Sequence, residues 1–357
     1  MSDRVAPTLA SLVGRQTPGL QYVAVDATTT LAAHAMGLAR IAERQAMTMS
    51  HTMMAYSMTK TFTAIAVLQL VEAGRLGLDD AMDQYVPDTP YANTGITIRH
   101  LLTHTAGLPN PIPLRWVHLV ESHTGFDEAT ARREVLRAHP RLVRAPGERF
   151  AYTNIGHWLL GAIVERVSGM SYAEYVRSAL LDRLGVPATA LDFTIPDPSR
   201  HANGYLAKYS VINLLKGFVT DRALWGGYEG RWLRLEPHHL NGPAFGGLVG
   251  TAHGIAALLQ DQLRPESVLL SASTKQLLDA PQFTRAHTPI PMTLGWHIGR
   301  ASDGLTWLFK EGGGGGFHSE MRLYPAHGVG TVIIVNSTTF HSARALDRID
   351  RALLVSR

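Results

Sequence analysis

Ser57 and Lys60 are the first residues whose types and spacing can do chemistry, in the stretch AYSMTK at residues 55–60. A helix that begins near Ser57 places both side chains on one face, one turn apart and within hydrogen-bonding distance. The unpaired N–H groups of a first helical turn favour a developing oxyanion and lower the pKa of a nearby ammonium. The pattern predicts a serine nucleophile activated by a lysine. It is short and common, however, and a serine helix cap followed by a solvated lysine is the alternative.

Lysine is scarce in this chain, which makes Lys60 more informative. The 33 basic residues include only five lysines: Lys60, Lys208, Lys216, Lys275 and Lys310. An ammonium can release its proton, whereas a guanidinium effectively cannot. We therefore interpret a lysine in this chain as a residue kept for its chemistry.

Tyr152 and Asn154 form a second candidate group, in PGERFAYTNIGHWLLG. A turn presents them, and apolar residues at helical spacing fix a helix behind the turn. Tyr152 is placed to move the serine proton, and Asn154 to hold Lys60 and an acyl oxygen. The alternative is a packed tyrosine beside an Asn N-cap. A second Tyr-x-Asn, at Tyr91 and Asn93, lies in a loop with no helix directly behind it, and we give it no role.

A glycine run forms the third group, in WLFKEGGGGGFHSEMRLYP. We expect a strand that carries Lys310 and ends at the glycine run Gly312–Gly316. Glycine costs roughly 0.5–1 kcal/mol against alanine in regular structure, so the run indicates backbone that approaches another group closely. The N–H groups of Gly313 and Ser57 would then form an oxyanion hole. A flexible linker is the alternative, and a phosphate loop is disfavoured because the chain has no Gly-Lys dipeptide and no helix follows the run.

The order serine–lysine, Tyr-x-Asn and Lys-x-Gly resembles the serine β-lactamase and penicillin-binding-protein superfamily. The closer resemblance is to its class C-like branch, which includes esterases, D-aminopeptidases and D-alanyl-D-alanine carboxypeptidases. The stretches IRHLLTHTAGLP, FGGLVGTAHGIAALL and GFHSEMRLYP add to the resemblance, which spans roughly residues 15 to 350. The combination is far more specific than any one motif.

This resemblance implies a role for each matching residue. Ser57 is the acylated nucleophile, and Lys60 and Tyr152 share the general-base role. Asn154 and Lys310 complete the polar network, and the two N–H groups named above bind the oxyanion. Which of the lysine and the tyrosine takes the serine proton is left open by the sequence.

The expected strands and helices must position these groups. Alternating residues predict two strands near the N-terminus and further strands in the last third, followed by a C-terminal helix. This indicates an α/β (α+β) fold: an antiparallel sheet from both termini, flanked by helices, with a mostly helical region inserted. The resemblance implies the β-lactamase/transpeptidase-like fold. We expect one catalytic unit over residues 1–357, with a sheet part at about 1–50 plus 285–357 and a helical part at about 51–284. Residues 205–240, rich in glycine and aromatics, predict an excursion near the site.

Glu311 departs from the superfamily pattern, which usually has Thr or Ser there to help hold a substrate carboxylate. A glutamate facing the site would repel a carboxylate, by about 1 kcal/mol at about 4 Å in water and about 4 kcal/mol at an effective dielectric of about 20. We therefore predict a serine hydrolase that cleaves neutral carboxylic esters through a Ser57 acyl-enzyme, with Glu311 and Gly312 contacting substrate. Trp116 and Trp225 are candidates for an apolar acyl pocket.

Several other functions compete with this prediction. Within the superfamily they are β-lactamase, D-amino-acid peptidase or DD-carboxypeptidase activity, acyl transfer, and a non-catalytic binding module. His100 and His104, at i and i+4, suggest a metal hydrolase, but no glutamate follows the first histidine and no third ligand is evident. The absence of Gly-x-Ser-x-Gly disfavours an α/β-hydrolase. We expect no metal or other cofactor, and a small-molecule ester or amide as substrate.

The amino-acid composition limits the remaining classes of function and location. The chain is 45% hydrophobic and 17% charged, typical of a globular protein, and its net charge of +4 is scattered, which disfavours a nucleic-acid partner. No apolar stretch reaches the ~18 residues of a membrane span. The absence of cysteine excludes disulfides and thiolate catalysis. The N-terminus predicts a short amphipathic helix rather than a secretory signal, so we expect a cytoplasmic location. The oligomeric state is not indicated.

Overall fold

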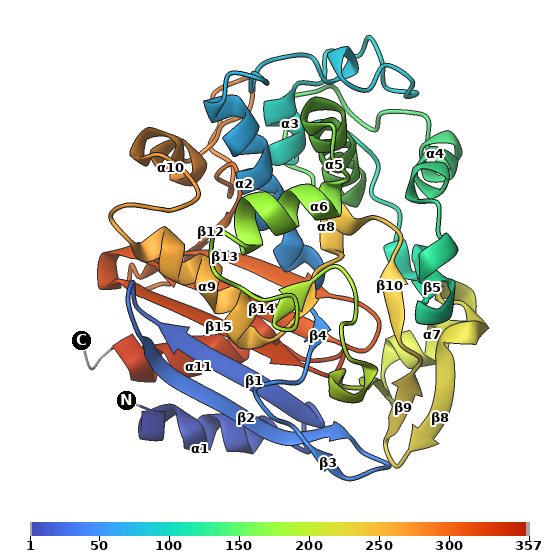
Figure 1. Cartoon of the computed structure of the whole chain (residues 1–357), viewed down its shortest axis with the longest axis vertical. Helices are drawn as coiled ribbons and strands as arrows, with labels where there is room; N and C mark the ends of the chain where they lie inside the picture. Colours follow the sequence, from blue (N-terminus) through green and yellow to red (C-terminus); the bar gives the residue numbers. More distant parts are fainter. Residues whose placement is uncertain (1, 355–357) are drawn as a thin grey trace.

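A seven-stranded antiparallel sheet organises the protein, whose computed structural model describes residues 2–354 (Figure 1). The strand order is β12-β13-β14-β15-β1-β2-β3. The strands are β1 (Gly19–Val25), β2 (Thr30–Arg40), β3 (Gln45–Ala46), β12 (His297–Arg300), β13 (Thr306–Gly313), β14 (His318–Tyr324) and β15 (Val329–Val335). β1 pairs with β15, with Leu20 opposite Val335, and this pairing joins the first strands of the chain to the last. The predicted antiparallel sheet from both termini is confirmed.

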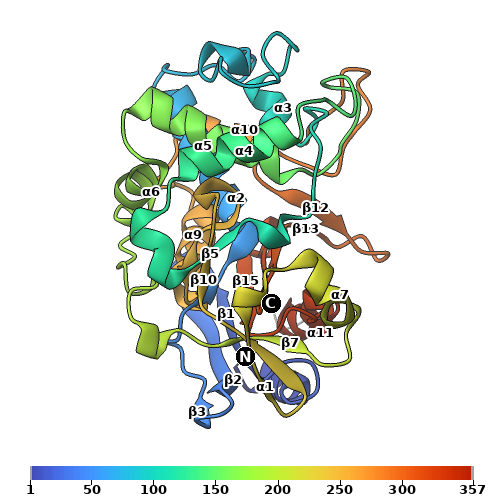
Figure 2. The same ribbon diagram turned by 90° about the vertical axis from the view of Figure 1, so that its right-hand side faces the viewer.

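Helices cover both faces of this sheet (Figure 2). α1 (Ser2–Leu12) and α11 (Ser342–Leu354) lie on one face, and α9 (Ala252–Leu263) lies on the other. Successive side chains of a strand point to opposite faces. In β15, accordingly, Ile333 and Val335 are buried with α1 and α11, whereas Val332 and Ile334 belong to the core under α9. Burial on both faces explains why β15 reads as a continuous apolar run.

A mostly helical region stands above the sheet in Figure 1 and surrounds α2 (Thr59–Glu72). α2 is buried along most of its length and carries apolar residues all round, as a central helix must. It ends where Gly74 takes a left-handed φ of 66°. The other helices of the region are α3 (Ile98–Leu102), α4 (Glu128–Ala138), α5 (Asn154–Ser168), α6 (Tyr172–Val176), α8 (Pro243–Gly246) and α10 (Ala272–Asp279).

Residues 205–240 form a small layer beside the main sheet. They contribute most of a three-stranded sheet, ordered β7-β9-β8, and α7 (Val211–Val219). Its strands are β7 (Gly204–Ala207), β8 (Trp225–Glu229) and β9 (Trp232–Leu235). Tyr205 N donates a hydrogen bond of 3.0 Å to Gly316 O, which fixes this layer against the glycine run.

Two further pairings complete the connections. β5 (Val117–Leu119) pairs with β10 (His238–Leu240), and β11 (Val249–Gly250) lies between β4 (Met53–Met54) and β6 (Leu191–Asp192). β4 leads directly into the turn that carries Ser57. Across residues 2–354, none of the helices combines the length and the apolar character that crossing a membrane requires.

Candidate active site

Ser57 lies in a single 3-10 turn, η1 (Tyr56–Met58), immediately before α2. α2 begins at Thr59, slightly later than predicted, but the one-turn spacing is kept and Lys60 Nζ lies 2.8 Å from Ser57 Oγ. Tyr56 has a φ of 46°, a left-handed conformation that is strained for a bulky residue. Such strain is typical of a functional turn held by its surroundings.

The amine of Lys60 is fully buried and meets three oxygens. It lies 2.8 Å from Ser57 Oγ, 2.8 Å from Asn154 Oδ1 and 2.6 Å from the carbonyl oxygen of Phe245. Burial lowers the pKa of Lys60 well below its usual value, and the nearby Lys310 lowers it further. A neutral amine has two hydrogens and one lone pair. Because the amide and carbonyl oxygens only accept, they take the two hydrogens, and the lone pair is left facing Ser57.

Tyr152 approaches the same serine from the loop before α5. Its hydroxyl donates a 2.9 Å hydrogen bond to Ser57 Oγ. Burial raises the pKa of Tyr152 above its usual value, and the charge of Glu311 raises it further, although the hydrogen bond to Ser57 opposes this shift. The phenol is therefore protonated at neutral pH and acts as a donor.

Three histidines pack behind the phenol ring. The ring centre of His104 lies 4.5 Å from that of Tyr152 and 4.8 Å from that of His157, and His297 stacks beside Tyr152 at 6.2 Å. His104 Nδ1 accepts a 3.3 Å hydrogen bond from the backbone of Thr153. Burial lowers the pKa values of all three imidazoles, and the two lysines of the site lower them further. Neutral rings thus surround the site without adding charge.

Lys310 reaches the site from β13 but does not join the hydrogen-bond network. Its side chain is buried, and its Nζ lies 5.8 Å from the ring centre of Tyr152, over the ring face. Among residues 2–354 it has no hydrogen-bond partner, unlike Lys60. Burial lowers the pKa of Lys310 to about 7. Lys310 therefore lies beside the site without a hydrogen bond to Ser57 or Lys60, whereas Asn154 contacts Lys60 directly as predicted.

The N–H of Gly313 points toward the nucleophile's turn. Gly314 N donates to Phe317 O across the hairpin, and donors alternate along an antiparallel strand, so the N–H of Gly313 faces the other edge of β13. On that edge β12 pairs with β13 only as far as Phe309, and η1 packs beyond it. The N–H of Gly313 is therefore directed at the turn of Ser57, where the predicted oxyanion hole would lie.

The glycine run makes the close approach that the sequence predicts. A Cβ placed on Gly312 would lie 2.3 Å from the carbonyl oxygen of Ala55 and 3.0 Å from Ser57 N. A Cβ on Gly314 would lie 2.5 Å from the ring of Tyr56. The hydroxyl of Tyr56 in turn donates a 2.6 Å hydrogen bond to Gly315 O. The residue before the nucleophile and the hairpin are thus locked together.

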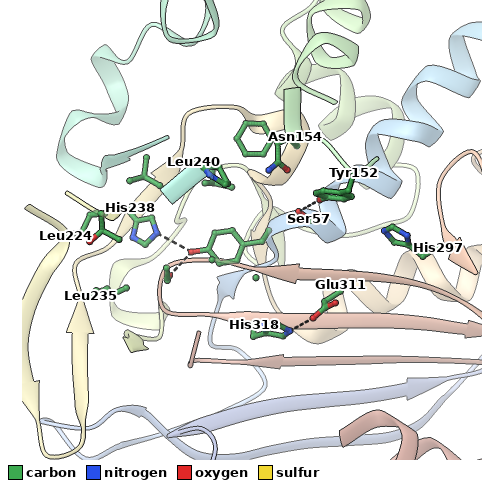
Figure 3. Close-up of a pocket in the computed structure, with 18 of the residues that line it drawn as sticks. Ser57, Tyr152, Asn154, Leu224, Leu235, His238, Leu240, His297, Glu311 and His318 are labelled. Atoms are coloured by element: carbon green, nitrogen blue, oxygen red, sulfur yellow. Dashed lines mark hydrogen bonds and ion pairs between the residues drawn. The ribbon is translucent and has the colours of Figure 1, made fainter. Parts of the chain in front are cut away.

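A cavity of about 570 Å³ opens in front of Ser57 (Figure 3). Figure 3 shows Ser57 and Tyr152 at one end and Leu224 and Leu235 at the other. Most of its wall is apolar, from Val117, Phe150, Leu224, Leu235, Leu240, Phe245 and Phe309. An apolar cavity with a few converging polar groups is the usual form of a small-molecule site.

Glu311 lines this cavity, and 49% of its side chain is exposed. Its Oε1 lies 2.8 Å from Nε2 of His318, which also lines the cavity and contacts Ser342 Oγ at 3.1 Å. The hydrogen bond from His318 holds the pKa of Glu311 below its usual value, so Glu311 is ionised at neutral pH. The departure from the superfamily pattern therefore places a negative charge in the cavity wall (Figure 3).

Comparison with known proteins gives the chain a family. The family model described as "Beta-lactamase" matches residues 5–356, almost the whole sequence. The chain belongs to the beta-lactamase family. The predicted resemblance to the serine β-lactamase and penicillin-binding-protein superfamily is confirmed.

Curated relatives of this beta-lactamase family member match only in part. Penicillin-binding protein 4* of Bacillus subtilis is 31% identical over 176 residues, which are 48% of this chain and 38% of that protein. Protein flp of Staphylococcus aureus is 33% identical over 159 residues, 42% of this chain and 30% of that protein. The matched segments thus span about a third of the length of these relatives.

Solved structures support the fold over the whole chain. D-amino acid amidase from Ochrobactrum anthropi, complexed with L-phenylalanine amide, covers 99% of both chains with a TM-score of 0.81 at 21% identity. An octameric penicillin-binding protein homologue from Pyrococcus abyssi has a TM-score of 0.78 at 23% identity, over 99% of this chain and 76% of that one. At these identities the likeness shows the β-lactamase/transpeptidase-like fold.

Three residues of this beta-lactamase family member that were predicted to contact substrate lie outside the lining of the cavity. Trp116 and Trp225 are not among the residues that line the cavity. Trp116 packs behind Phe245, and the indole of Trp225 donates a 2.8 Å hydrogen bond to Thr220 Oγ1. Both indoles therefore support the wall from behind. Gly312, also predicted to contact substrate, is instead buried against the turn of Ser57.

Several residues of the site were missed from the sequence. Tyr56 immediately precedes Ser57. The available signal for its contact was a bulky residue next to Ser57 together with a glycine run elsewhere in the sequence. His318 directly follows that run, and its pairing with Glu311 depends on a hairpin. His104 was weighed only as a metal ligand, yet its ring supports Tyr152, while His100 Nδ1 accepts a 3.2 Å hydrogen bond from Thr97 N at the start of α3.

Proposed function

We propose that this protein is a serine hydrolase that cleaves carboxylic esters through an acyl-enzyme on Ser57. One observation carries the proposal: Ser57 Oγ meets a deprotonatable amine at 2.8 Å and a phenol at 2.9 Å at the end of a largely apolar cavity. A nucleophile within hydrogen-bonding distance of its base, which a third group orients, is the arrangement that covalent catalysis needs.

Acylation follows from the contacts of Lys60. The neutral amine takes the proton of Ser57 as Oγ bonds to the ester carbonyl carbon, and the carbonyl oxygen becomes an oxyanion bound by the two N–H groups. The new ammonium keeps its contacts with Asn154 Oδ1 and the Phe245 carbonyl. Collapse breaks the bond to the alcohol, whose oxygen takes up the proton. In this proposal Lys60 is therefore the general base. Tyr152 is the group that relays the proton to the leaving oxygen.

Deacylation reverses the same steps with water. A water molecule gives its proton to Lys60 while its oxygen bonds to the acyl carbon, and the Ser57–acyl bond then breaks. The ammonium of Lys60, 2.8 Å from Ser57 Oγ, returns that proton to the serine as the bond breaks, and the phenol of Tyr152 keeps its hydrogen bond to the same oxygen. General-base catalysis of this kind contributes about 10²–10⁴-fold to the rate.

The cavity supports a neutral ester with an apolar acyl group. Its wall is mainly aliphatic and aromatic, which favours an acyl chain. Glu311 is ionised at the wall and disfavours substrates that place a carboxylate there. β-Lactams and peptide C-termini carry such a carboxylate. A small-molecule ester is therefore our preferred substrate, and the expected cytoplasmic location stays a prediction.

An amino-acid amide is the second candidate, and the charge of Glu311 favours it. The same carboxylate that repels an anion attracts the ammonium of an unblocked amino acid. The fold neighbour from Ochrobactrum anthropi is described as a D-amino acid amidase. This candidate keeps the whole mechanism and changes only the leaving group and the charge of the substrate.

A substrate panel distinguishes these functions. We would compare kcat/KM for p-nitrophenyl esters of increasing chain length, D-phenylalanine amide, nitrocefin and a peptide ending in D-Ala-D-Ala, with Ser57→Ala as the blank. The proposal expects the esters to dominate, with an optimum at an intermediate chain length. Dominant turnover of the amide would select the second candidate, and dominant turnover of nitrocefin or the peptide would overturn both.

A further inference from the structure

A second cavity, of about 390 Å³, lies apart from Ser57 and is lined by arginines. It forms where the segment after α1, the start of β9 and the first turns of α11 come together. Figure 2 shows α1, β7 and α11 at this part of the molecule. Its charged wall consists of Arg15, Arg231, Arg344 and Arg348, which come from three separate segments.

These four guanidinium groups are not neutralised. Each arginine is exposed, and none of the residues that line the cavity is acidic. Among the side chains that the structure describes, no carboxylate lies within 4.0 Å of any of them, and none of the four side chains makes a hydrogen bond. The nearest acidic residue on α11, Asp347, is paired instead with Arg322 at 2.8 Å.

The placement of these charges is unfavourable for the fold itself. Arg344 and Arg348 stand at i and i+4 on one helix, where like charges repel. Arg344 also lies in the first turn of α11, next to the positive end of the helix dipole, and that turn contains no acidic residue. A bound anion would relieve both costs at once.

We propose that this cavity binds a compound with two or more phosphate groups. The planar guanidinium matches phosphate oxygens with paired hydrogen bonds, which a lysine ammonium cannot do. Four such groups from three segments around one cavity suit several linked phosphates better than a single small anion. Trp232 lies under Arg231, with the guanidinium 5.5 Å from its ring, and holds one of the four in place. A low-dielectric concave wall concentrates the positive field.

Titration calorimetry with inorganic tripolyphosphate at low ionic strength tests this site. The proposal expects saturable binding at one site, weakened as salt rises. Loss of two charge-assisted contacts in Arg344→Gln/Arg348→Gln should weaken binding roughly a hundredfold. Arg137→Gln, which removes an exposed arginine from α4 outside the cavity, is the matched control and should bind as the parent does.

A variant on a second segment controls for a folding defect caused by the changes in α11. Arg231→Gln should also weaken binding although it leaves α11 untouched, and the melting temperature and ester turnover of each variant should match the parent. Absence of saturable binding, unchanged affinity in the double variant, or an equal loss in Arg137→Gln would overturn the proposal. Phosphatidylcholine vesicles containing phosphatidic acid form the last arm of the experiment. Binding to these vesicles without binding of tripolyphosphate would overturn the proposal that the ligand is a soluble compound.

Discussion

At the scale of single residues, the role that we propose for Lys60 rests on its loss of a proton and not on its charge. Its amine has two acceptor oxygens for its hydrogens and one serine for its lone pair. A guanidinium keeps the positive charge but cannot accept the serine proton. The two roles of a lysine in such a site, base and electrostatic support, are therefore separable by one substitution.

Lys60→Arg should lower kcat/KM for the best ester about 10²–10⁴-fold, since general-base help is lost. Stopped-flow measurement of p-nitrophenol release should show slower acylation as well as slower turnover. Lys208→Arg makes the same change at an exposed position and serves as the control. Near-parental acylation in Lys60→Arg would mean that Lys60 acts only through its charge.

Glu311 places a carboxylate in the cavity wall, and we propose that it sets the charge preference of the cavity. Glu311→Thr removes the carboxylate and supplies a hydroxyl, so substrates with a carboxylate should gain. We expect the ratio of kcat/KM for mono-p-nitrophenyl succinate over p-nitrophenyl butyrate to rise at least roughly fivefold, which corresponds to about 1 kcal/mol of repulsion. The same change at the exposed Glu43 should leave the ratio as it is. An unchanged ratio in Glu311→Thr would remove Glu311 from substrate selection.

At the scale of elements, the hairpin of β13 and β14 positions Ser57 through backbone contacts. Gly312→Ala would push its Cβ against the Ala55 carbonyl and Ser57 N, two backbone atoms that have no rotamer to change. We expect kcat/KM to fall about 10²-fold or more, the cost of losing one oxyanion donor. Gly227→Ala, on β8 with open space around it, is the control and should retain full activity. Full activity of Gly312→Ala would show that β13 and the turn of Ser57 can move apart without cost.

Local spacing explains what the sequence could predict at this scale. Ser57 and Lys60 are one helical turn apart, so their contact follows from helix geometry alone. The strands of the main sheet alternate or run apolar for enough residues to be predicted. The contact between Tyr56 and Gly315 and the contacts of Trp116 join distant segments, and their register depends on packing that no local pattern encodes. The excursion at 205–240 lacked a period, so its sheet and the orientation of Trp225 were not predictable.

At the scale of the whole molecule, buried histidines make the fold sensitive to acid. Burial lowers the pKa values of His104, His157, His201 and His239, with His201 and His239 at about 3. Their pKa values return to about 6.5 when the chain unfolds. Below that pH the unfolded state binds protons that the folded state does not bind, so the free energy of unfolding falls as the pH falls.

The free energy of unfolding should therefore drop below pH 6.5 by up to about 1.4 kcal/mol per pH unit for each such histidine, until its folded pKa is reached. Chemical denaturation followed by circular dichroism between pH 8 and pH 5 measures the slope. His201→Gln should reduce the slope, while His287→Gln, at an exposed position, should not. A flat profile across this range would contradict the burial of these rings as neutral groups.

The fold as a whole was the most predictable level, because the motifs of the superfamily mark elements of both the sheet and the helical region. Ser57 follows β4, Asn154 starts α5 and Lys310 lies on β13, so three motifs fix how these elements converge. Charge distribution was not predictable in the same way. Four arginines without a partner among the described side chains gather in one cavity because the segment after α1, the start of β9 and the first turns of α11 pack together, and in the sequence they look scattered.

Convergence of these motifs on one serine is the central claim, and covalent labelling tests it most directly. The protein would be treated with ethyl p-nitrophenyl phosphonate, digested, and the modified peptide located by mass spectrometry. We predict a single adduct on Ser57, formed much more slowly in Lys60→Arg and absent in Ser57→Ala, which should also lose ester turnover. An adduct on any other residue, or turnover that persists in Ser57→Ala, would contradict the claim.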